Sequence, residues 1–449
     1  MAEIAPFRGL RYNPDKAPDL SKVTAPPYDV IDEAGRAELA RRDEHNIVRL
    51  ILPEEEGGRD RYACAADLLE RWLDEDVLVQ DAEPGIYVIR QEWQDDAGRH
   101  ERTGFVAAVK LEPFSQGKIY PHESTMSSPK EDRLKLLKAT RTNLSQVFSL
   151  FPDERQDVDA WLTATSAGTP DAQSIDDAGV LTKLWCVFDE TSIRALRDML
   201  KGREMFIADG HHRYETALNY QRFCAESVPE FPREPSESSR NADQIFPHDA
   251  LMMLCVATNN AGVLTRPTHR LLSRDAADPE NLIQRLKERF SVRSIATFSH
   301  KTGELDAILR SDATPNLMVL YVGASRPPMT VQPQEGEKML AHMPEHSEIW
   351  RSLDVSILQY AILEGILGLS LEHVTQGNKI GYVHDADEAK RRVDAGEFSA
   401  AFVLRPTPLR AMVEVASHLE RMPPKSTFFY PKAVTGMVLR RLESGKKRA

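Results

Sequence analysis

The chain has 449 residues, 41% of them hydrophobic and 28% charged, which is the composition of a folded globular protein with two or three domains. Its formal net charge of −12 argues against nucleic acid as a partner, because such binders gain most of their affinity by neutralising phosphates with basic residues. The N-terminus lacks the apolar core of a signal peptide and no stretch approaches the ~20 apolar residues that span a bilayer, so we expect a cytoplasmic protein without a membrane partner.

The first part of the chain combines loops, helices and a hairpin. Two prolines in the segment Val23–Ile31 exclude a helix there, and the turn residues Asp95–Gly98 between two alternating segments predict an antiparallel hairpin. In chain order we expect a helix at 33–45, a strand at 47–52, an amphipathic helix at 61–76 and hairpin strands at 85–93 and 102–111.

The middle of the chain alternates buried strands with helices, interrupted by a polar stretch at 152–180 and by residues 226–247, which predict a surface loop or mobile lid. Here we expect a helix at 130–140, strands at 147–151, 184–188 and 205–208, a helix at 191–201, a helix from about 211 past 220 and an apolar strand at 251–257.

The last third also alternates. We expect helices at 279–289, 354–367, 385–396 and 407–420, and strands at 316–322, 380–383 and 400–404. The pattern predicts an α+β (mixed α/β) fold of several domains, which we divide into 1–112, 113–275 and 276–449. The sequence does not indicate an oligomeric state. Free thiols in a reducing compartment are the expected state of Cys64, Cys186, Cys224 and Cys255, which have neither zinc-knuckle nor redox spacing.

The strongest chemical signal is the run Ile207–Tyr214, in which a buried strand leads through Asp209 and Gly210 into a helix. The first N–H groups of a helix have no internal partners and sit at the positive end of its dipole, so they form an anion site. Arg213 adds a fork that matches two phosphate oxygens. The carboxylate of Asp209 can hold Mg²⁺ or accept a hydroxyl proton. The alternative is that Asp209 only caps the helix and the two histidines are surface residues.

A second constellation begins at His122 and Glu123 and continues into a charged helix with Lys130 and Arg133, one turn apart. Phosphoryl transfer needs cations to neutralise developing charge and a carboxylate to orient or deprotonate the attacking hydroxyl. We assign the base to Glu123. The competing interpretation is a solvated charged helix after a loop.

A third constellation is the segment Lys425–Lys432, in which two lysines bracket Ser-Thr and aromatic residues; a C-terminal strand with Phe428 and Tyr430 packed inward explains it equally well. The segment Arg266–Arg270, which follows an apolar strand, has the same two interpretations, as part of a functional site or as a structural segment. Tyr28 and Asp29, in the rigid Pro-Pro loop, either line a pocket or stabilise a turn.

The chain lacks Walker-type, dinucleotide-binding and His-Glu-x-x-His motifs.

The run Asp209–Arg213 resembles the phosphate-binding signature of the ParB/sulfiredoxin superfamily, whose members include ParB nucleotide hydrolases, sulfiredoxins and kinases of free L-serine. Over nearly its whole length the chain also resembles the bacterial family called domain of unknown function 1015. The second resemblance rests on Pro6–Gly9, Ala25–Ile31, Pro121–Glu123, Ile207–Leu218 and Pro424–Lys432.

The resemblance implies a ParB/sulfiredoxin-like phosphate-binding core and a kinase that converts L-serine into O-phospho-L-serine, with Mg²⁺ as cofactor. ATP, ADP and pyrophosphate remain open as donor, since no adenine pocket is recognisable. We assign catalysis to Glu123, Asp209 and His211, with Asp209 also the metal ligand. Donor phosphates are assigned to Gly210, His212, Arg213, Lys130 and Arg133. The substrate is assigned to His122, Arg141, Asn143, Thr268, His269, Lys425 and Lys432. The alternatives are a phosphoserine phosphatase-like hydrolase and a ParB-like nucleotide-binding regulatory module.

Overall fold

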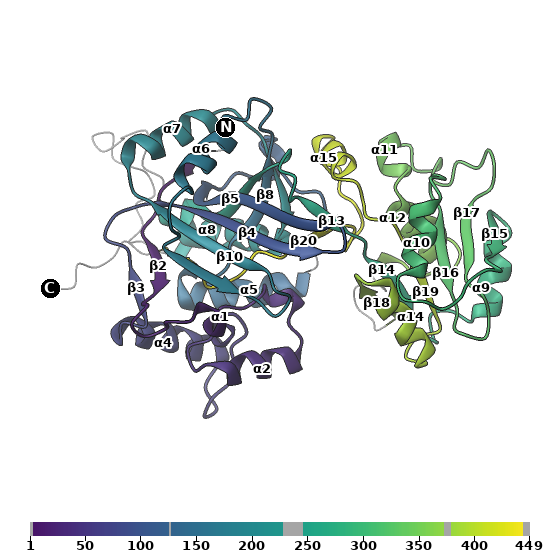
Figure 1. The fold of residues 1–449 in the computed structure, drawn as a ribbon, viewed down its shortest axis with the longest axis horizontal. Helices are drawn as coiled ribbons and strands as arrows, with labels where there is room; N and C mark the ends of the chain where they lie inside the picture. Colours follow the sequence, from purple (N-terminus) through teal and green to yellow (C-terminus); the bar gives the residue numbers. More distant parts are fainter. Residues whose placement is uncertain (1–2, 125–126, 228–245, 372–378, 443–449) are drawn as a thin grey trace. The chain divides into compact units, whose positions relative to one another are not determined.

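The computed structural model describes residues 3–124, 127–227, 246–371 and 379–442. The chain forms two compact units (Figure 1). Unit 1 comprises Met1–Tyr120, Met126–Val263 and Pro431–Ala449, and unit 2 comprises Pro121–Thr125 and Leu264–Tyr430. This division differs from the predicted 1–112, 113–275 and 276–449, because strands from the first two predicted regions pair within one sheet and the chain returns to unit 1 at its C-terminal end.

The centre of unit 1 is a nine-stranded sheet with the order β6-β11-β8-β12-β5-β4-β10-β9, and β1 pairs with β5. The predicted hairpin is confirmed: β4 and β5 pair in unbroken antiparallel register up to the turn at Asp95 and Gly98. Strand β12 is buried along its whole length, as its apolar sequence predicts. The strands are β1 (Ile4–Ala5), β4 (Ile86–Asp95), β5 (Gly98–Lys110), β6 (Ile119–Tyr120), β8 (Val147–Phe151), β9 (Ala172–Ile175), β10 (Leu181–Val187), β11 (Met205–Asp209) and β12 (Ala250–Ala257).

Helices α6 (Asp157–Thr165) and α7 (Glu190–Leu200) lie side by side against this sheet (Figure 1). Leu162 of α6 and Leu196 of α7 share a core with alternate residues of β5 such as Phe105. Successive side chains of a strand point to opposite faces of the sheet, so every second residue of β5 faces α6 and α7 and packs against them. The predicted polar stretch at 152–180 thus contains helix α6 and strand β9, which were missed.

Aspartates fix the starts of several helices. Each of them accepts a hydrogen bond at its side chain from a backbone N–H of the first turn and so satisfies a donor without an internal partner. The capping residues are Asp32 before α2 (Glu33–Arg42), Asp60 before α4 (Arg61–Asp74), Asp189 before α7, Asp278 before α9 (Pro279–Leu286) and Asp385 before α14 (Ala386–Asp394). All five helices were predicted.

A second part of unit 1 is formed by the four-stranded sheet β3-β2-β21-β7 and the N-terminal helices. The strand predicted at 47–52 is wrong: the segment forms helix α3 (Val48–Ile51). Oδ1 of Asn46, just before it, accepts from the N–H of Val48 at 2.9 Å. A short, fully buried apolar run has no period that separates strand from helix. The remaining elements are β2 (Gly9–Tyr12), α1 (Leu20–Val23), η1 (Tyr28–Val30), β3 (Leu78–Gln80), η2 (Phe114–Gln116), β7 (Thr142–Asn143) and β21 (Leu439–Arg441).

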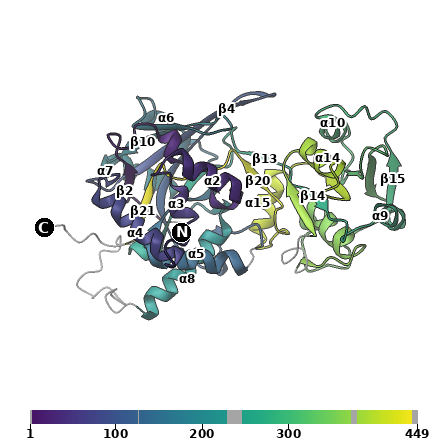
Figure 2. The ribbon, with the colours of Figure 1, turned by 90° about the horizontal axis from the view of Figure 1, so that it is seen from below.

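Helices α5 (Ser127–Thr140) and α8 (His211–Ser227) run side by side in unit 1 (Figure 2). Leu137 of α5 and Tyr220 and Cys224 of α8 form a small shared core. Both helices were predicted. The predicted loop or lid at 226–247 lies almost entirely outside the described residues.

Unit 2 contains the six-stranded sheet β15-β17-β16-β19-β14-β18 and the separate pair β13-β20. Helices α10 and α14 share a core with β16 and β19. The helix predicted at 354–367 begins as α12 and continues as a π-helical segment. Strands β15 and β17 and helix α10 were missed. The elements not yet given are η3 (Pro247–Asp249) in unit 1 and, in unit 2, β13 (Leu264–Arg266), β14 (His269–Leu272), β15 (Phe290–Ser294), α10 (Glu304–Ser311), β16 (Met318–Tyr321), β17 (Met329–Pro333), α11 (Glu348–Arg351), α12 (Asp354–Ser356), η4 (Ile357–Glu364), β18 (Ile380–Val383), β19 (Ala400–Val403), α15 (Leu409–Ser417) and β20 (Phe428–Tyr430).

The mixed α/β class and the multi-domain organisation predicted from the sequence are confirmed. Within the described ranges, no helix is both long enough and apolar enough to span a bilayer.

Candidate functional site

The predicted strand–turn–helix junction is present in unit 1. Strand β11 ends at Asp209, Gly210 follows with a φ of +92°, and α8 begins at His211. The N–H of Tyr214 donates to the carbonyl of Gly210 at 3.0 Å, which starts the helical hydrogen-bond series. The buried hydroxyl of Tyr214 also donates to the carbonyl of Glu112 at 2.9 Å. The bonds to Gly210 and Glu112 therefore fix the first turn of α8. The N–H groups that precede Tyr214 in this turn have no acceptor within the helix itself.

The carboxylate of Asp209 is held by two cations. Its Oδ1 forms an ion pair with Nζ of Lys432, and its Oδ2 accepts from Nη2 of Arg213 at 2.7 Å. Burial by itself would raise the pKa of Asp209, but the charges of Lys432 and Arg213 hold it well below the usual range. Asp209 therefore stays ionised, and such a weakly basic carboxylate is a poor proton acceptor.

Arg213 is fixed by three neighbours. One Nη donates to the carbonyl of Gln146 and the other to Asp209. The guanidinium lies against Gly210, where a Cβ would be only 2.9 Å from Nε. Nε is buried and has no hydrogen-bond acceptor within the part of the chain that the structure describes.

Lys432 reaches Asp209 from the C-terminal segment. The carbonyl of Lys432 accepts from Nε2 of Gln91 at 3.0 Å, and the carbonyl of Pro431 accepts from Nη2 of Arg102 at 2.6 Å. Strands β4 and β5 thus hold this segment in place. The sequence placed Lys432 with the substrate; the structure places it on the carboxylate of the central motif.

Arg102 is a third cation near Asp209, and the sequence reasoning missed it. Its side chain is fully buried, with the guanidinium 4.7 Å from the ring centroid of Phe148. Burial lowers the pKa of Arg102 to about 9, and the negative charge of Asp209 opposes this shift. Two cations, Arg213 and Lys432, thus contact the carboxylate of Asp209, and Arg102 lies near enough to interact with its charge. These four groups together carry a net charge of two positive units.

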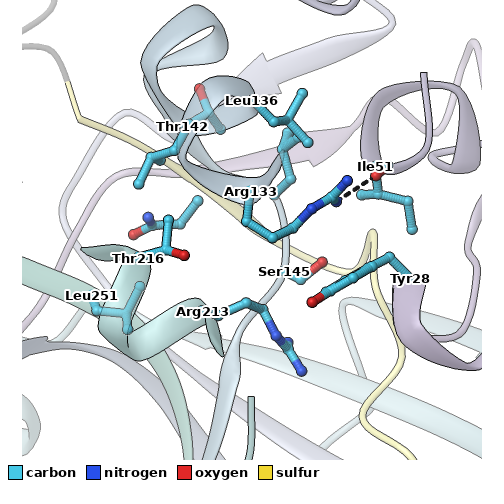
Figure 3. Close-up of a pocket in the computed structure, with 12 residues that line it drawn as sticks. Tyr28, Ile51, Arg133, Leu136, Thr142, Ser145, Arg213, Thr216 and Leu251 are labelled. Atoms are coloured by element: carbon cyan, nitrogen blue, oxygen red, sulfur yellow. Dashed lines mark hydrogen bonds between the residues drawn. The ribbon is translucent and has the colours of Figure 1, made fainter. Parts of the chain in front are cut away.

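A cavity of about 60 Å³ lies beside Arg213 (Figure 3). Its polar lining includes Tyr28, Arg133 and Ser145, and leucines such as Leu136 cover its apolar side. The Arg133 guanidinium lies 4.2 Å from the centroid of the Tyr28 ring. Burial and the charge of Asp29 raise the pKa of Tyr28 to about 12, so its hydroxyl stays protonated. Of the two residues predicted to line a pocket, Tyr28 lines this cavity and Asp29 is not among its lining residues.

Other predicted residues of unit 1 have structural partners. Lys130 of α5 forms an ion pair with Glu215 of α8 at 2.8 Å. Asn143 also lines the cavity, and its Oδ1 accepts from the N–H of Met252 at 3.1 Å. Arg141 is exposed beyond α5. His211 is buried and His212 is half-buried in the first turn of α8.

Unit 2 contains a second cluster of predicted residues, around Glu123. Oε1 of Glu123 accepts from the N–H of Lys425 at 2.7 Å, and the Lys425 carbonyl accepts from Arg270 at 3.0 Å. Lys425 has a φ of +62°, which is strained for a residue with a side chain. Burial lowers the pKa of Arg270, and the charges of Tyr382 and Glu123 oppose this.

Three further predicted residues lie in unit 2. Nε2 of His122 is 2.7 Å from the hydroxyl of Thr427, and the hydroxyl of Thr268 is 3.3 Å from Nδ1 of His384. His269 is fully buried, and its Nδ1 accepts from a backbone N–H. Burial lowers the pKa of His269 to about 3, so its ring is neutral at neutral pH. The structure thus sorts the predicted residues into two clusters, one in each unit.

The magnesium prediction depends on which side chains could act as ligands. Among the described residues, no three or more His, Cys, Asp or Glu side chains gather into a possible ligand set. Both oxygens of Asp209 face cations, which leaves them unsuited to hold Mg²⁺ in this arrangement. The magnesium cofactor stays a prediction.

The family model described as a protein of unknown function, DUF1015, matches residues 4–356. The chain belongs to this family. The matched range contains the Asp209–Arg213 junction and Glu123, whereas Lys425 and Lys432 lie beyond it. No curated protein matches the chain. The ParB-like nature of the Asp209–Arg213 run stays a prediction.

Solved structures give only distant likenesses to this DUF1015 member. A free serine kinase in complex with AMP is 11% identical, with a TM-score of 0.36 over 73% of this chain and 86% of that chain. A conserved hypothetical protein from Pyrococcus furiosus is 13% identical, with a TM-score of 0.34 over 73% of this chain and 90% of that chain. SbnI with a C-terminal truncation, from Staphylococcus aureus, is 9% identical, with a TM-score of 0.34 over 75% and 90%. These scores are too low to assign an activity.

Proposed function

We propose that the protein is a phosphotransferase that phosphorylates a small free hydroxy metabolite, with L-serine as acceptor and O-phospho-L-serine as product. The donor is ATP, ADP or pyrophosphate. The observation that carries this proposal is the net charge of two positive units on Asp209 and three cations: Arg213 and Lys432, which contact it at the start of α8, and Arg102, which interacts with its charge. The choice of L-serine rests on the resemblance of Asp209–Arg213 to the signature of free L-serine kinases.

Such a site has the electrostatics that phosphoryl transfer needs. The reaction requires positioning and neutralisation of charge on the transferred group more than covalent help from the protein. The early N–H groups of α8, together with Arg213 and Lys432, would receive donor phosphate oxygens. Asp209 would then act as the anchor that orders both cations before the donor arrives.

In the proposed reaction, the hydroxyl oxygen of the acceptor forms a bond to the terminal phosphorus as the bond from that phosphorus to the leaving phosphate oxygen breaks. The hydroxyl proton passes to a carboxylate. Asp209 is unsuited to accept it, because two cations depress its basicity. We therefore keep Glu123 of unit 2 as the proposed base, and its role is tested separately from that of the donor site.

The deciding experiment is incubation of the full chain with L-serine and each donor in turn, with phosphoserine detected by mass spectrometry and phosphorus NMR. Phosphoserine formed with one donor and lost in Arg213→Ala supports the proposal. Release of phosphate from phosphoserine, without its formation, would favour a hydrolase. Nucleotide binding without turnover would favour a regulatory module.

A further inference from the structure

The charged residues that line the cavity beside Arg213 are all positive. Two arginines, Arg133 and Arg213, are among its lining residues, and none of these residues is Asp or Glu. Burial between apolar walls strengthens the field of these charges, since the local dielectric constant is lower than that of water. Each arginine is also paired with one carboxylate, Asp132 or Asp209, so the cavity favours an anion through the N–H groups that these ion pairs leave over.

Its size restricts the ligand to a small group. A cavity of ~150 Å³ accommodates a benzene ring, and this one measures about 60 Å³. The enclosed space matches a carboxylate with its adjoining carbon, and the rest of a ligand would lie outside it. Leu144 and Leu251 lie on its apolar side, and the uncharged polar lining residues are Tyr28, Thr142, Asn143, Ser145 and Thr216.

The side chains around the cavity keep hydrogen-bond donors for such a group. A guanidinium has five N–H groups. Arg133 uses three of them, on Asp132 and on the carbonyl of Ile51. The other two have no partner within the described ranges. The Tyr28 hydroxyl likewise has no partner among the described residues, and Figure 3 shows it pointing between Arg133 and Arg213.

We propose that this cavity binds the carboxylate of the acceptor, with Arg133 and Tyr28 as its principal donors. The inference rests on the proposed function and deepens it, because it names the acceptor as a small hydroxy acid whose carboxylate is recognised apart from the donor phosphates. It also moves Arg133, which the sequence grouped with the donor site, to the acceptor. Arg213 contacts both Asp209 and the cavity, so it links the two subsites.

The test is calorimetric binding of L-serine and of L-serinamide to the full chain without a donor. The two ligands differ only in the replacement of the carboxylate by a neutral amide. We expect L-serine to bind at least tenfold more tightly than L-serinamide. In Arg133→Met this preference should be lost, while pyrophosphate affinity stays within about twofold of wild type. Tyr28→Phe, which keeps the ring under Arg133, should weaken L-serine binding about threefold to tenfold.

A matched control is Arg61→Met. Arg61 also donates to Asp132, at 2.7 Å, but does not line the cavity. The same carboxylate keeps Tyr62 as a partner in either variant, which protects the fold. L-serine affinity should therefore be unchanged in Arg61→Met.

The outcomes separate this inference from the proposed function. Equal affinity for L-serine and L-serinamide, or unchanged L-serine affinity in both Arg133→Met and Tyr28→Phe, overturns the carboxylate subsite even if phosphoserine is made. A loss of pyrophosphate affinity in Arg133→Met as large as the loss for L-serine assigns the cavity to the donor and overturns it too. Binding that depends on the carboxylate and on Arg133, in a protein that makes no phosphoserine, supports the subsite and rejects the kinase.

Discussion

The guanidinium of Arg213 lies on the face of Gly210 from which a side chain would project. A Cβ on Gly210 would come within 2.9 Å of Nε and 3.0 Å of Cζ of Arg213. Gly210 also has a φ of +92°, which residues with side chains rarely adopt. Glycine is thus required here twice, once for the turn from β11 into α8 and once for the position of the arginine that holds Asp209.

Gly210→Ala should disturb both stability and donor binding. We expect the free energy of unfolding to fall by about 2–4 kcal/mol, of which ~1–2 kcal/mol is backbone strain and the remainder comes from the displaced, buried contacts of Arg213. Urea unfolding and donor calorimetry measure the two effects. Gly179→Ala is the control, because Gly179 has a φ of +77° in the same unit and nothing within 4 Å of a Cβ. Equal losses in both variants would show that the contact with Arg213 is unimportant.

Arg213→Ala should weaken donor binding more than tenfold, because a charged hydrogen-bonded contact is worth ~1.5–3 kcal/mol. Arg222→Ala serves as the control: Arg222 lies on the same helix, exposed, with Asn219 as its side-chain partner. Circular dichroism checks that both variants are folded. Unchanged donor affinity in a folded Arg213→Ala variant would remove this residue from the donor site.

Asp209 should give the protein an acid-sensitive component of stability. Its pKa in the folded state lies well below the ordinary 3.8. On acidification the unfolded chain therefore takes up this proton first, and the stabilisation present above about pH 4 is lost as the pH falls further. In Asp209→Asn, the slope of unfolding free energy against pH below pH 4 should be shallower by up to about 1.4 kcal/mol per pH unit. Parallel curves for the two proteins in urea titrations at pH 3–6 would contradict the ion-pair assignment.

Local signals explain what the sequence predicted correctly. The hairpin of β4 and β5 follows from alternation and turn chemistry, and the junction at Gly210 follows from a buried strand, a glycine and a helix in succession. The strand predicted at 47–52 was wrong because this short, mostly apolar run has no period that separates a strand from a helix, and it forms α3.

Long-range contacts explain what the sequence could not show. Lys432 and Asp209 are 223 positions apart, and their pairing depends on how strands β4 and β5 hold the C-terminal segment. Arg102 is a buried cation in the middle of a strand, where the pattern favours an apolar or exposed residue. The division into two units was missed because one sheet gathers strands from distant parts of the chain.

Glu123 has an environment that makes a conservative test of its role feasible. Its Oε1 accepts from the N–H of Lys425, and a glutamine at this position retains an oxygen that can accept the same bond. Glu420 offers a matched comparison in unit 2, because its Oε1 also accepts from a backbone N–H at 2.7 Å, that of Ser347. The pair of variants separates loss of a carboxylate base from loss of a structural contact.

Glu123→Gln should lower kcat for phosphoserine formation by roughly 10²–10⁴, because the amide cannot accept the hydroxyl proton. Donor affinity should stay near the wild-type value, since the proposed donor site consists of Arg213, Lys432 and the start of α8 and does not include Glu123. Glu420→Gln should leave both quantities unchanged. Asp209→Asn should differ from Glu123→Gln by weakening donor binding as well, because it releases the two cations that the carboxylate orders. If Glu123→Gln keeps most of its activity while Asp209→Asn loses only kcat, the base is Asp209 and the two roles must be exchanged.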